Sequence, residues 1–174
     1  MAAHSYLHPK DRRVNDSPMS QHHAHVRWDR GERPFTYGEY SRDHDIRFGA
    51  AGDGAALRAS AAEEYRGTPA LPNPEEQLVA ALSTCHMLTF LAIAARRGIG
   101  VDRYDDHAEG TLGKNAEGRL AVTRVILRPT VVFSSDARVD ASLLATLHQG
   151  AHRGCFIAAS VKTEISIEAP QAIS

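Results

Sequence analysis

The feature that most constrains this chain is an apolar stretch over residues 78–95 that contains no Asp, Glu, Lys or Arg. It is preceded by Asn73 and Pro74, residue types that favour the N-cap and the first position of a helix. It is followed by residues typical of a helix end, namely Arg96, Arg97 and Gly98. The sequence therefore predicts one long helix over 73–98. Because apolar side chains occur on every face of it, we expect this helix to be buried on all sides.

A polar cluster lies in the middle of this helix: Ser83, Thr84, Cys85 and His86. The uncharged stretch is just long enough to span a membrane, which takes about 18 to 20 apolar residues. However, polar side chains near the midpoint make membrane insertion costly, and the rest of the chain patterns as a sheet that needs a core. We therefore expect the core helix of a soluble domain, with no membrane partner.

Composition points to one globular domain. The 174-residue chain has a formal net charge of −1, which argues against nucleic acid as its main partner. Residues 1–20 are polar and aperiodic, so we expect a disordered N-terminal extension there and a single domain over 21–174. With no apolar segment of a signal peptide in view, we expect a cytoplasmic protein. Two cysteines are too few for a disulfide framework, and in that compartment a Cys pair is more often catalytic or redox-active than structural.

The segments on either side of the helix alternate mainly as strands. We expect strands ending at residue 28 and over 35–48, 55–59, 101–112, 119–133 and 160–168, and a second, amphipathic helix over 139–153. This order predicts an α+β fold. Three histidines, His22, His23 and His25, suggest either a metal site or the exposed face of the first strand. We favour the strand, because no Cys, Asp or Glu lies nearby at ligand spacing.

The chemistry of Cys85 requires a cation that the helix itself does not supply. For a single cysteine in apolar surroundings, an inert buried thiol is the commoner case. A reactive cysteine acts as a thiolate, and burial in an apolar helix raises the thiol pKa. Cys85 lies too far from the helix N-terminus for the dipole to help. Arginine suits this role because it stays charged when buried, and a carboxylate such as Glu75 would hold it in place. His86 points about 100° away from Cys85 around the helix, so we favour a hydrogen-bonded buried histidine over a catalytic base.

Two segments resemble the OsmC/Ohr family of thiol peroxidases. NPEEQLVAALSTCH is similar to the family's Asn-Pro-Glu-Glu-Leu … Cys segment, and AHRGCFIAASVKTEISIE resembles its second-cysteine segment. The resemblance runs over 42–168. It implies an OsmC-like fold, with antiparallel sheets packed around a long buried central helix in an intertwined homodimer. It also implies a peroxidatic Cys85, a resolving Cys155 and a carboxylate at Glu75. Arg42 matches the arginine of the organic-hydroperoxide branch and Arg66 that of the osmotically induced branch, so both remain candidates.

The resemblance implies a thiol-dependent peroxidase that reduces organic, lipid-like hydroperoxides. A sulfenic acid would form on Cys85, Cys155 would condense with it to a disulfide, and an external dithiol would restore the enzyme without a metal or organic cofactor. Two departures favour an alternative, a small-molecule-binding or redox-sensing protein on the same fold. The family often has Cys-Pro where this chain has Cys155-Phe156, and Phe where it has His86.

The spacing of Glu75 and Cys85 bears on the oligomeric state. Ten residues on one helix separate two side chains by roughly 15 Å along the axis and about 80° around it, which a Glu side chain cannot span. Glu75 therefore either serves only the helix dipole or reaches the Cys85 of a second chain. With the resemblance, we expect a homodimer with shared active sites.

Overall fold

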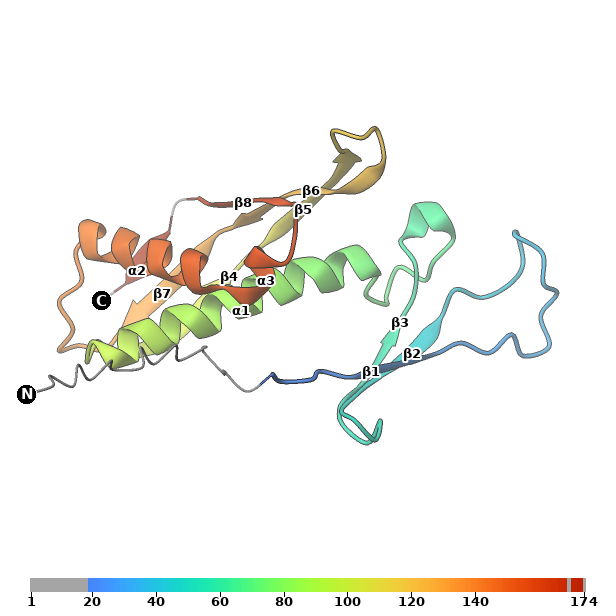
Figure 1. The fold of residues 1–174 in the computed structure, drawn as a ribbon, viewed down its shortest axis with the longest axis horizontal. Helices are drawn as coiled ribbons and strands as arrows, with labels where there is room; N and C mark the ends of the chain where they lie inside the picture. The colour runs from blue at the N-terminus through green and yellow to red at the C-terminus, as the bar shows by residue number, and fades with distance from the viewer. Residues whose placement is uncertain (1–18, 169, 174) are drawn as a thin grey trace, which may run out of the picture.

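The computed structural model describes residues 19–168 and 170–173. The predicted extension over 1–20 lies outside the described residues, apart from Met19 and Ser20. The helices are α1 (Pro74–Arg96), α2 (Ala141–Gly154) and α3 (Phe156–Ala159), with one 3-10 turn, η1 (Glu63–Tyr65). The strands are β1 (Ala24–Arg27), β2 (His44–Phe48), β3 (Ala56–Ala59), β4 (Val101–Asp106), β5 (Glu109–Lys114), β6 (Leu120–Leu127), β7 (Pro129–Phe133), β8 (Glu164–Ile167) and β9 (Gln171–Ile173). Figure 1 shows α1 along the body of the molecule, with β1 to β3 set apart as an arm.

The central helix forms as the sequence predicts. The Asn73 side chain accepts a hydrogen bond from the Glu76 backbone N–H at 2.8 Å, and the Glu76 carboxylate accepts one from the Asn73 N–H at 2.9 Å. This reciprocal capping fixes the start of the helix. At the other end Gly98 takes a positive φ of 68°, the conformation that ends helices at glycine.

The sequence predicts a helix buried on all sides, but a single chain buries α1 on one side only. The fully buried side chains form one stripe at four-residue spacing: Leu82, His86, Phe90 and Ala94. On another face Leu88 is 58% exposed. One chain therefore covers one side of the helix and leaves apolar surface open. By length and composition α1 could cross a membrane, a test that core helices also pass. The hydrogen bonds of its Ser83 to β4 and of its His86 to α2 fit a core helix.

The two long predicted strands after the helix each break in two. The structure has three three-stranded sheets, β1-β2-β3, β4-β7-β9 and β5-β6-β8, so the chain changes sheet between β4 and β5 and again between β6 and β7. The breaks face each other, because Asp106 pairs with Pro129, which has no N–H to continue a ladder. The Asp106 carboxylate accepts hydrogen bonds from the Arg128 backbone N–H at 2.7 Å and from the Ser83 hydroxyl at 2.5 Å. This carboxylate thus joins both breaks to α1.

Two of the sheets are mixed, where the resemblance implied antiparallel ones. β8 runs parallel to β6, and β9 runs parallel to β7. The reason is that α2 and α3 lie between these strands in the chain, and a helical crossover returns the chain in the same direction.

The core has two parts that share α1. One lies between α1, α2 and β7 and includes Phe90, Val131 and Leu147. The other lies between α1, β6 and α3 and includes Leu82 and Val125. Both parts therefore pack against the same buried stripe of α1, one toward each end of the helix.

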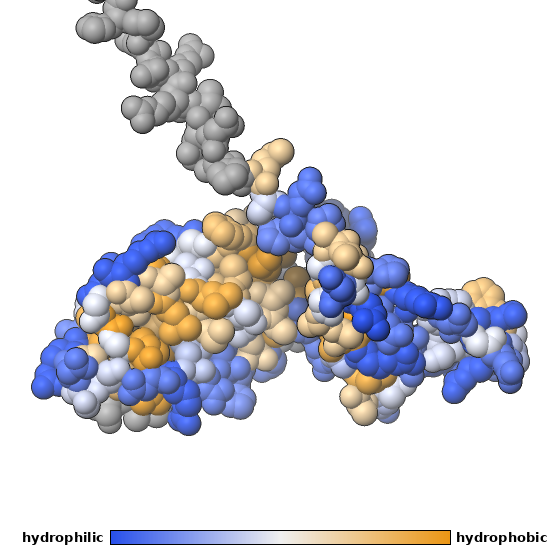
Figure 2. Space-filling view, turned by 90° about the horizontal axis from the view of Figure 1, so that it is seen from below, coloured by the Kyte–Doolittle hydropathy of each residue, from blue (hydrophilic) through white to orange (hydrophobic). Residues whose placement is uncertain are grey.

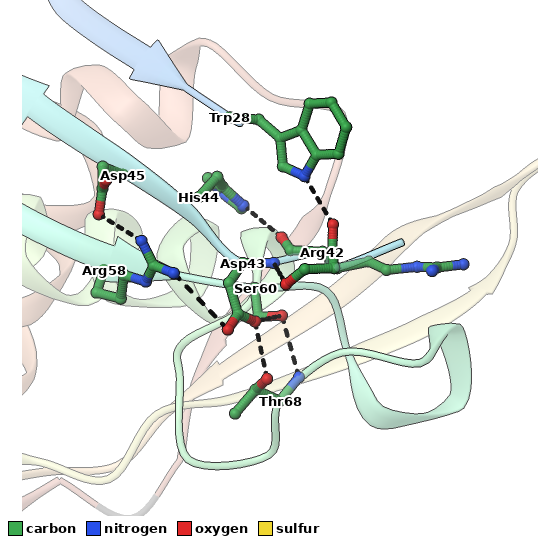
Figure 3. Close-up of polar contacts among 9 residues, drawn as sticks. Trp28, Arg42, Asp43, His44, Asp45, Arg58, Ser60 and Thr68 are labelled. Carbon is green, nitrogen blue, oxygen red and sulfur yellow. Dashed lines mark hydrogen bonds and ion pairs between the residues drawn. The ribbon is translucent and has the colours of Figure 1, made fainter. Parts of the chain in front are cut away.

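The arm is held at its base by a polar network that Figure 3 shows. The Asp43 carboxylate accepts hydrogen bonds from the hydroxyls of Ser60, at 2.9 Å, and Thr68, at 2.8 Å. These two hydrogen bonds and the nearby Arg58 guanidinium hold the pKa of Asp43 below its ordinary value, with the Thr68 bond contributing most and burial opposing them. Away from this base the arm leaves apolar side chains exposed, among them Val26 at 61% and Phe48 at 43%.

Candidate active site

The structure brings Cys85 and Cys155 into contact. Cys85 lies at the middle of α1 and is half-buried, whereas Cys155 is buried in the short connection between α2 and α3. Cys155 caps α3: its sulfur accepts a hydrogen bond from the Ala158 backbone N–H at 3.3 Å. The two cysteines are free thiols, and each shifts the pKa of the other, which requires neighbouring side chains. Seventy residues of sequence therefore separate two sulfur atoms that the fold places side by side.

The surroundings make Cys85 the more acidic thiol. Burial raises its pKa, but hydrogen bonds from the Cys155 thiol and from the backbone N–H groups of Ile157 and Phe156 outweigh this effect, so the pKa of Cys85 is lowered. Burial and the bond to Cys85 raise the pKa of Cys155. A thiolate therefore forms first on Cys85, with the Cys155 proton available to it.

Cys85 opens into an apolar groove of about 980 Å³ between α1, the start of α3 and the arm. Its apolar walls include Leu88 on α1, Phe156 on α3, and Phe48 and Leu57 on the arm. Phe156 is 83% exposed, which is unusual for so large an apolar side chain. Figure 2 shows apolar surface on the body of the molecule beside a largely hydrophilic arm. The groove suits an apolar ligand whose reactive end reaches Cys85.

Glu75 faces a different cavity. It lines a second hollow, of about 820 Å³, together with Glu76, Glu109 and Ser83. Cys85 does not line this hollow, although its neighbour Thr84 lines both. Within one chain the predicted carboxylate therefore does not reach the thiol, as the helix geometry leads one to expect.

The two candidate arginines lie close to one another, Arg42 just before β2 and Arg66 at the end of η1. The Arg42 guanidinium donates hydrogen bonds to the carbonyls of Tyr40 and Tyr37 and lies 5.0 Å from the Tyr37 ring centroid. The Arg66 guanidinium lies 5.9 Å from the same ring and donates to the Gly38 carbonyl at 3.4 Å. Figure 3 shows the Arg42 side chain pointing away from the polar network at the base of the arm. Neither arginine lines the groove at Cys85, so their predicted role stays a prediction.

His86 is the hydrogen-bonded buried histidine that its position on the helix indicates. It is 1% exposed, and its Nε2 lies 3.1 Å from Nδ1 of His148 on α2. Burial lowers the pKa of both side chains to about 4, and repulsion from His86 adds to this effect at His148. Both imidazoles are therefore neutral at neutral pH.

Several residues of the site were not identified from the sequence. The backbone N–H groups of Phe156 and Ile157 face the Cys85 sulfur. The Thr89 hydroxyl donates to the Cys85 carbonyl at 2.8 Å. Spacing could have found Thr89, since residues four apart share a helix face. In the described part of the chain, no group of three or more His, Cys, Asp or Glu side chains is placed to hold a metal ion.

Comparison with known proteins supports the resemblance. A family model described as OsmC-like protein matches residues 67–169, which contain both cysteines and Glu75 but neither arginine candidate. The chain is 29% identical over 97 residues to the uncharacterised protein YmaD of Bacillus subtilis (strain 168), a match that covers 55% of this chain and 64% of that protein.

Solved structures extend the match to nearly the whole chain. An OsmC-like protein of unknown function from Vibrio cholerae is 44% identical, with a TM-score of 0.81 over 89% of this chain and 100% of the other. An organic hydroperoxide resistance protein from Elizabethkingia anophelis shares the fold at 15% identity, with a TM-score of 0.65 over 91% of this chain and 99% of the other. Because the family model covers more than half of the sequence and places both cysteines within its span, the chain belongs to the OsmC-like family.

Proposed function

We propose that this protein is a thiol-dependent peroxidase that reduces organic, lipid-like hydroperoxides. The observation that carries the proposal is the contact between Cys85 and Cys155 at an apolar groove, with the pKa of Cys85 lowered and that of Cys155 raised. A nucleophile and a resolving thiol need this difference, because the first must attack as a thiolate while the second keeps its proton. The fold shared with organic hydroperoxide resistance proteins is consistent with this chemistry.

The proposed reaction balances with the two thiols and one external dithiol. The Cys85 thiolate attacks the terminal oxygen of the hydroperoxide, the O–O bond breaks, and the alkoxide leaves and takes a proton to become an alcohol. Cys85 is then a sulfenic acid. Cys155 attacks its sulfur, so that an S–S bond forms and water leaves. A dithiol reductant restores both thiols by exchange and itself becomes a disulfide, chemistry that suits the cytoplasm.

The cation that the thiolate lacks in one chain is proposed to come from a second chain in a homodimer. Three observations support this arrangement. The arm exposes apolar side chains, α1 is open on the Leu88 side, and Arg42, Arg66 and Glu75 all lie away from the Cys85 of their own chain. A second copy would cover the apolar surface and bring one of these arginines, oriented by Glu75, to each thiol.

The test of activity uses an organic hydroperoxide, a dithiol reductant and mass spectrometry. The wild-type protein should consume peroxide over many turnovers, and one equivalent of peroxide without reductant should produce a Cys85–Cys155 disulfide. Cys85→Ser should abolish both. A disulfide without turnover would instead indicate the redox-sensing alternative, and no reaction of either kind would refute the proposal.

The shared site has its own test, complementation in mixed dimers. Glu75→Gln and Cys85→Ser homodimers should each be impaired. A mixed dimer of the two variants contains one site with both wild-type residues if the site is shared between chains. It should recover up to half of the wild-type activity. Purified mixed dimers without recovery would leave Glu75 as a helix-start residue only.

A further inference from the structure

The buried histidine pair joins the two helices that carry the cysteines. His86 follows Cys85 on α1, and His148 lies on α2, which ends immediately before Cys155. The imidazole rings are nearly parallel, at 7° with centroids 5.4 Å apart, and their exposed fractions are 1% and 2%. Through the described residues, no other side-chain hydrogen bond links α1 to α2.

The pair is not an efficient way to stabilise a core. Whichever imidazole donates in the shared hydrogen bond, Nε2 of His148 stays buried without a partner. The hydroxyl of Tyr104, whose ring centroid lies 6.5 Å from that of His148, is also buried and unpaired. An unsatisfied buried polar atom costs roughly 1–3 kcal/mol, so apolar side chains at these positions would serve packing better. The pair therefore calls for a role other than stability.

The remaining contacts between α1 and α2 are mainly apolar. The helices approach closely at two glycines of α2. A Cβ at Gly154 would lie 2.9 Å from Cγ2 of Thr89, and one at Gly150 would lie 3.1 Å from Cδ1 of Ile93. Contacts of this kind are non-directional, whereas a buried hydrogen bond fixes the position of both partners. Disulfide formation needs such a fixed position, because its bond length and dihedral angle are narrowly defined.

We propose that His86 and His148 are positioning residues whose hydrogen bond fixes α2 on α1, so that the sulfur of Cys155 is held against that of Cys85. The inference rests on the Cys85–Cys155 disulfide of the proposed function, and it adds a role for two residues that touch neither the sulfur atoms nor the groove.

The test measures the dithiol–disulfide equilibrium in dithiothreitol redox buffers, without any peroxide. Oxidised dithiothreitol takes up the two electrons and two protons that the cysteines release. In His86→Leu/His148→Leu both partners become apolar, so the melting temperature should equal or exceed that of the wild type. Its equilibrium constant for disulfide formation should nevertheless fall about tenfold, or about 30 mV in reduction potential. If the pair were merely structural, its replacement would lower the melting temperature and leave this constant unchanged.

Two further variants complete the experiment. His86→Gln/His148→Asn places amide groups near the positions of Nε2 and Nδ1 and should keep the constant within about twofold of the wild type. Tyr104→Phe is the matched control, because it removes another unpaired buried polar atom, one near His148, without changing the link, and it should also leave the constant unchanged. Should the Leu pair fail to fold, His86→Gln/His148→Leu takes its place, with the same expected loss.

The outcomes separate this inference from the proposed function. A wild-type protein that forms no Cys85–Cys155 disulfide would overturn the proposed function and this role with it. If the apolar variant keeps the wild-type equilibrium constant for disulfide formation, the positioning role alone is overturned. A tenfold fall that the Gln/Asn pair reverses would establish it.

Discussion

The histidine pair should make the stability of this protein sensitive to mild acid. In the folded chain burial lowers the pKa of His86 to about 4, with the nearby Asp106 carboxylate opposing and His152 reinforcing the effect. Burial and the neighbouring His86 lower the pKa of His148 to about 4. In the unfolded chain both imidazoles bind a proton near pH 6.5. Between these values the unfolded state binds more protons than the folded state, so the free energy of unfolding decreases as the pH falls from about 6.5 to about 4.

The size of this effect follows from the shift. The difference between 6.5 and about 4, at about 1.36 kcal/mol per pKa unit, corresponds to roughly 3 kcal/mol for one imidazole. The pair is counted once, because part of the lowered pKa of His148 is repulsion from a charged His86. A loss of about 3 kcal/mol is a large part of the 5–15 kcal/mol that stabilises a typical domain.

Urea unfolding followed by circular dichroism between pH 7 and pH 4, at constant protein concentration, measures this loss. His86→Leu/His148→Leu is the matched control, because it keeps every carboxylate and all other histidines. The wild type should lose about 3 kcal/mol more than this variant over the interval. Parallel pH profiles for the two proteins would refute the reasoning, since they would place the acid sensitivity elsewhere.

Three further changes test the site itself. Either Arg42→Ala or Arg66→Ala should raise the pKa of Cys85 in an ultraviolet thiolate titration, depending on which arginine is the partner of the thiolate. Lysine at the same position should restore the pKa only in part. No change in either variant would mean that another cation acts. Phe156→Pro removes a backbone N–H beside Cys85 and should raise its pKa, whereas Phe156→Ala keeps the N–H and should not. Cys155→Ser should permit one attack on peroxide and leave Cys85 open to further oxidation, seen by mass spectrometry as the addition of two or more oxygen atoms.

The parts of the fold that the sequence predicts are those encoded locally. Asn73, Pro74 and Glu76 define the start of α1 through contacts within four residues, and Gly98 defines its end. The turn between β5 and β6 is equally local: Gly118 has a φ of 75°, and its N–H donates to the Asn115 carbonyl. Such signals need no knowledge of the rest of the chain.

The strand breaks after the helix were missed because their cause is not local. Residues 101–112 alternate well enough for one strand, and the break at Asp106 depends on the Arg128 backbone and the Ser83 hydroxyl, each more than twenty residues away. Pro129 is a visible signal, because proline in a sheet is confined to edges, bulges and strand starts, and it is the first residue of β7. To predict the effect of this proline on the facing strand one must know the pairing register, which the sequence does not contain.

The candidate site likewise has parts that the sequence indicates and parts that depend on contacts distant in the sequence. The resemblance selected Cys85 and Cys155, but periodicity alone gives no reason for two residues seventy positions apart to meet. The pairing of His86 with His148 was missed for the same reason. A signal existed, because His148 follows Leu144 and Leu147 on the inward face of an amphipathic helix, where a histidine needs a buried partner.

The rate and the substrate specificity of the proposed peroxidase depend on which groups one chain brings together and which it does not. The sulfur pair, the two backbone N–H groups and the histidine link all lie within one chain, so every group that the proposed disulfide step uses is present there. Arg42, Arg66 and Glu75, which would stabilise the thiolate and the leaving oxygen, lie elsewhere on the same chain. The groove combines residues from the body of the molecule with two residues of the arm, Phe48 and Leu57. In the proposed dimer, then, resolution of the sulfenic acid depends on the internal packing of α1 and α2, whereas attack on peroxide and the choice of substrate depend on contacts between chains.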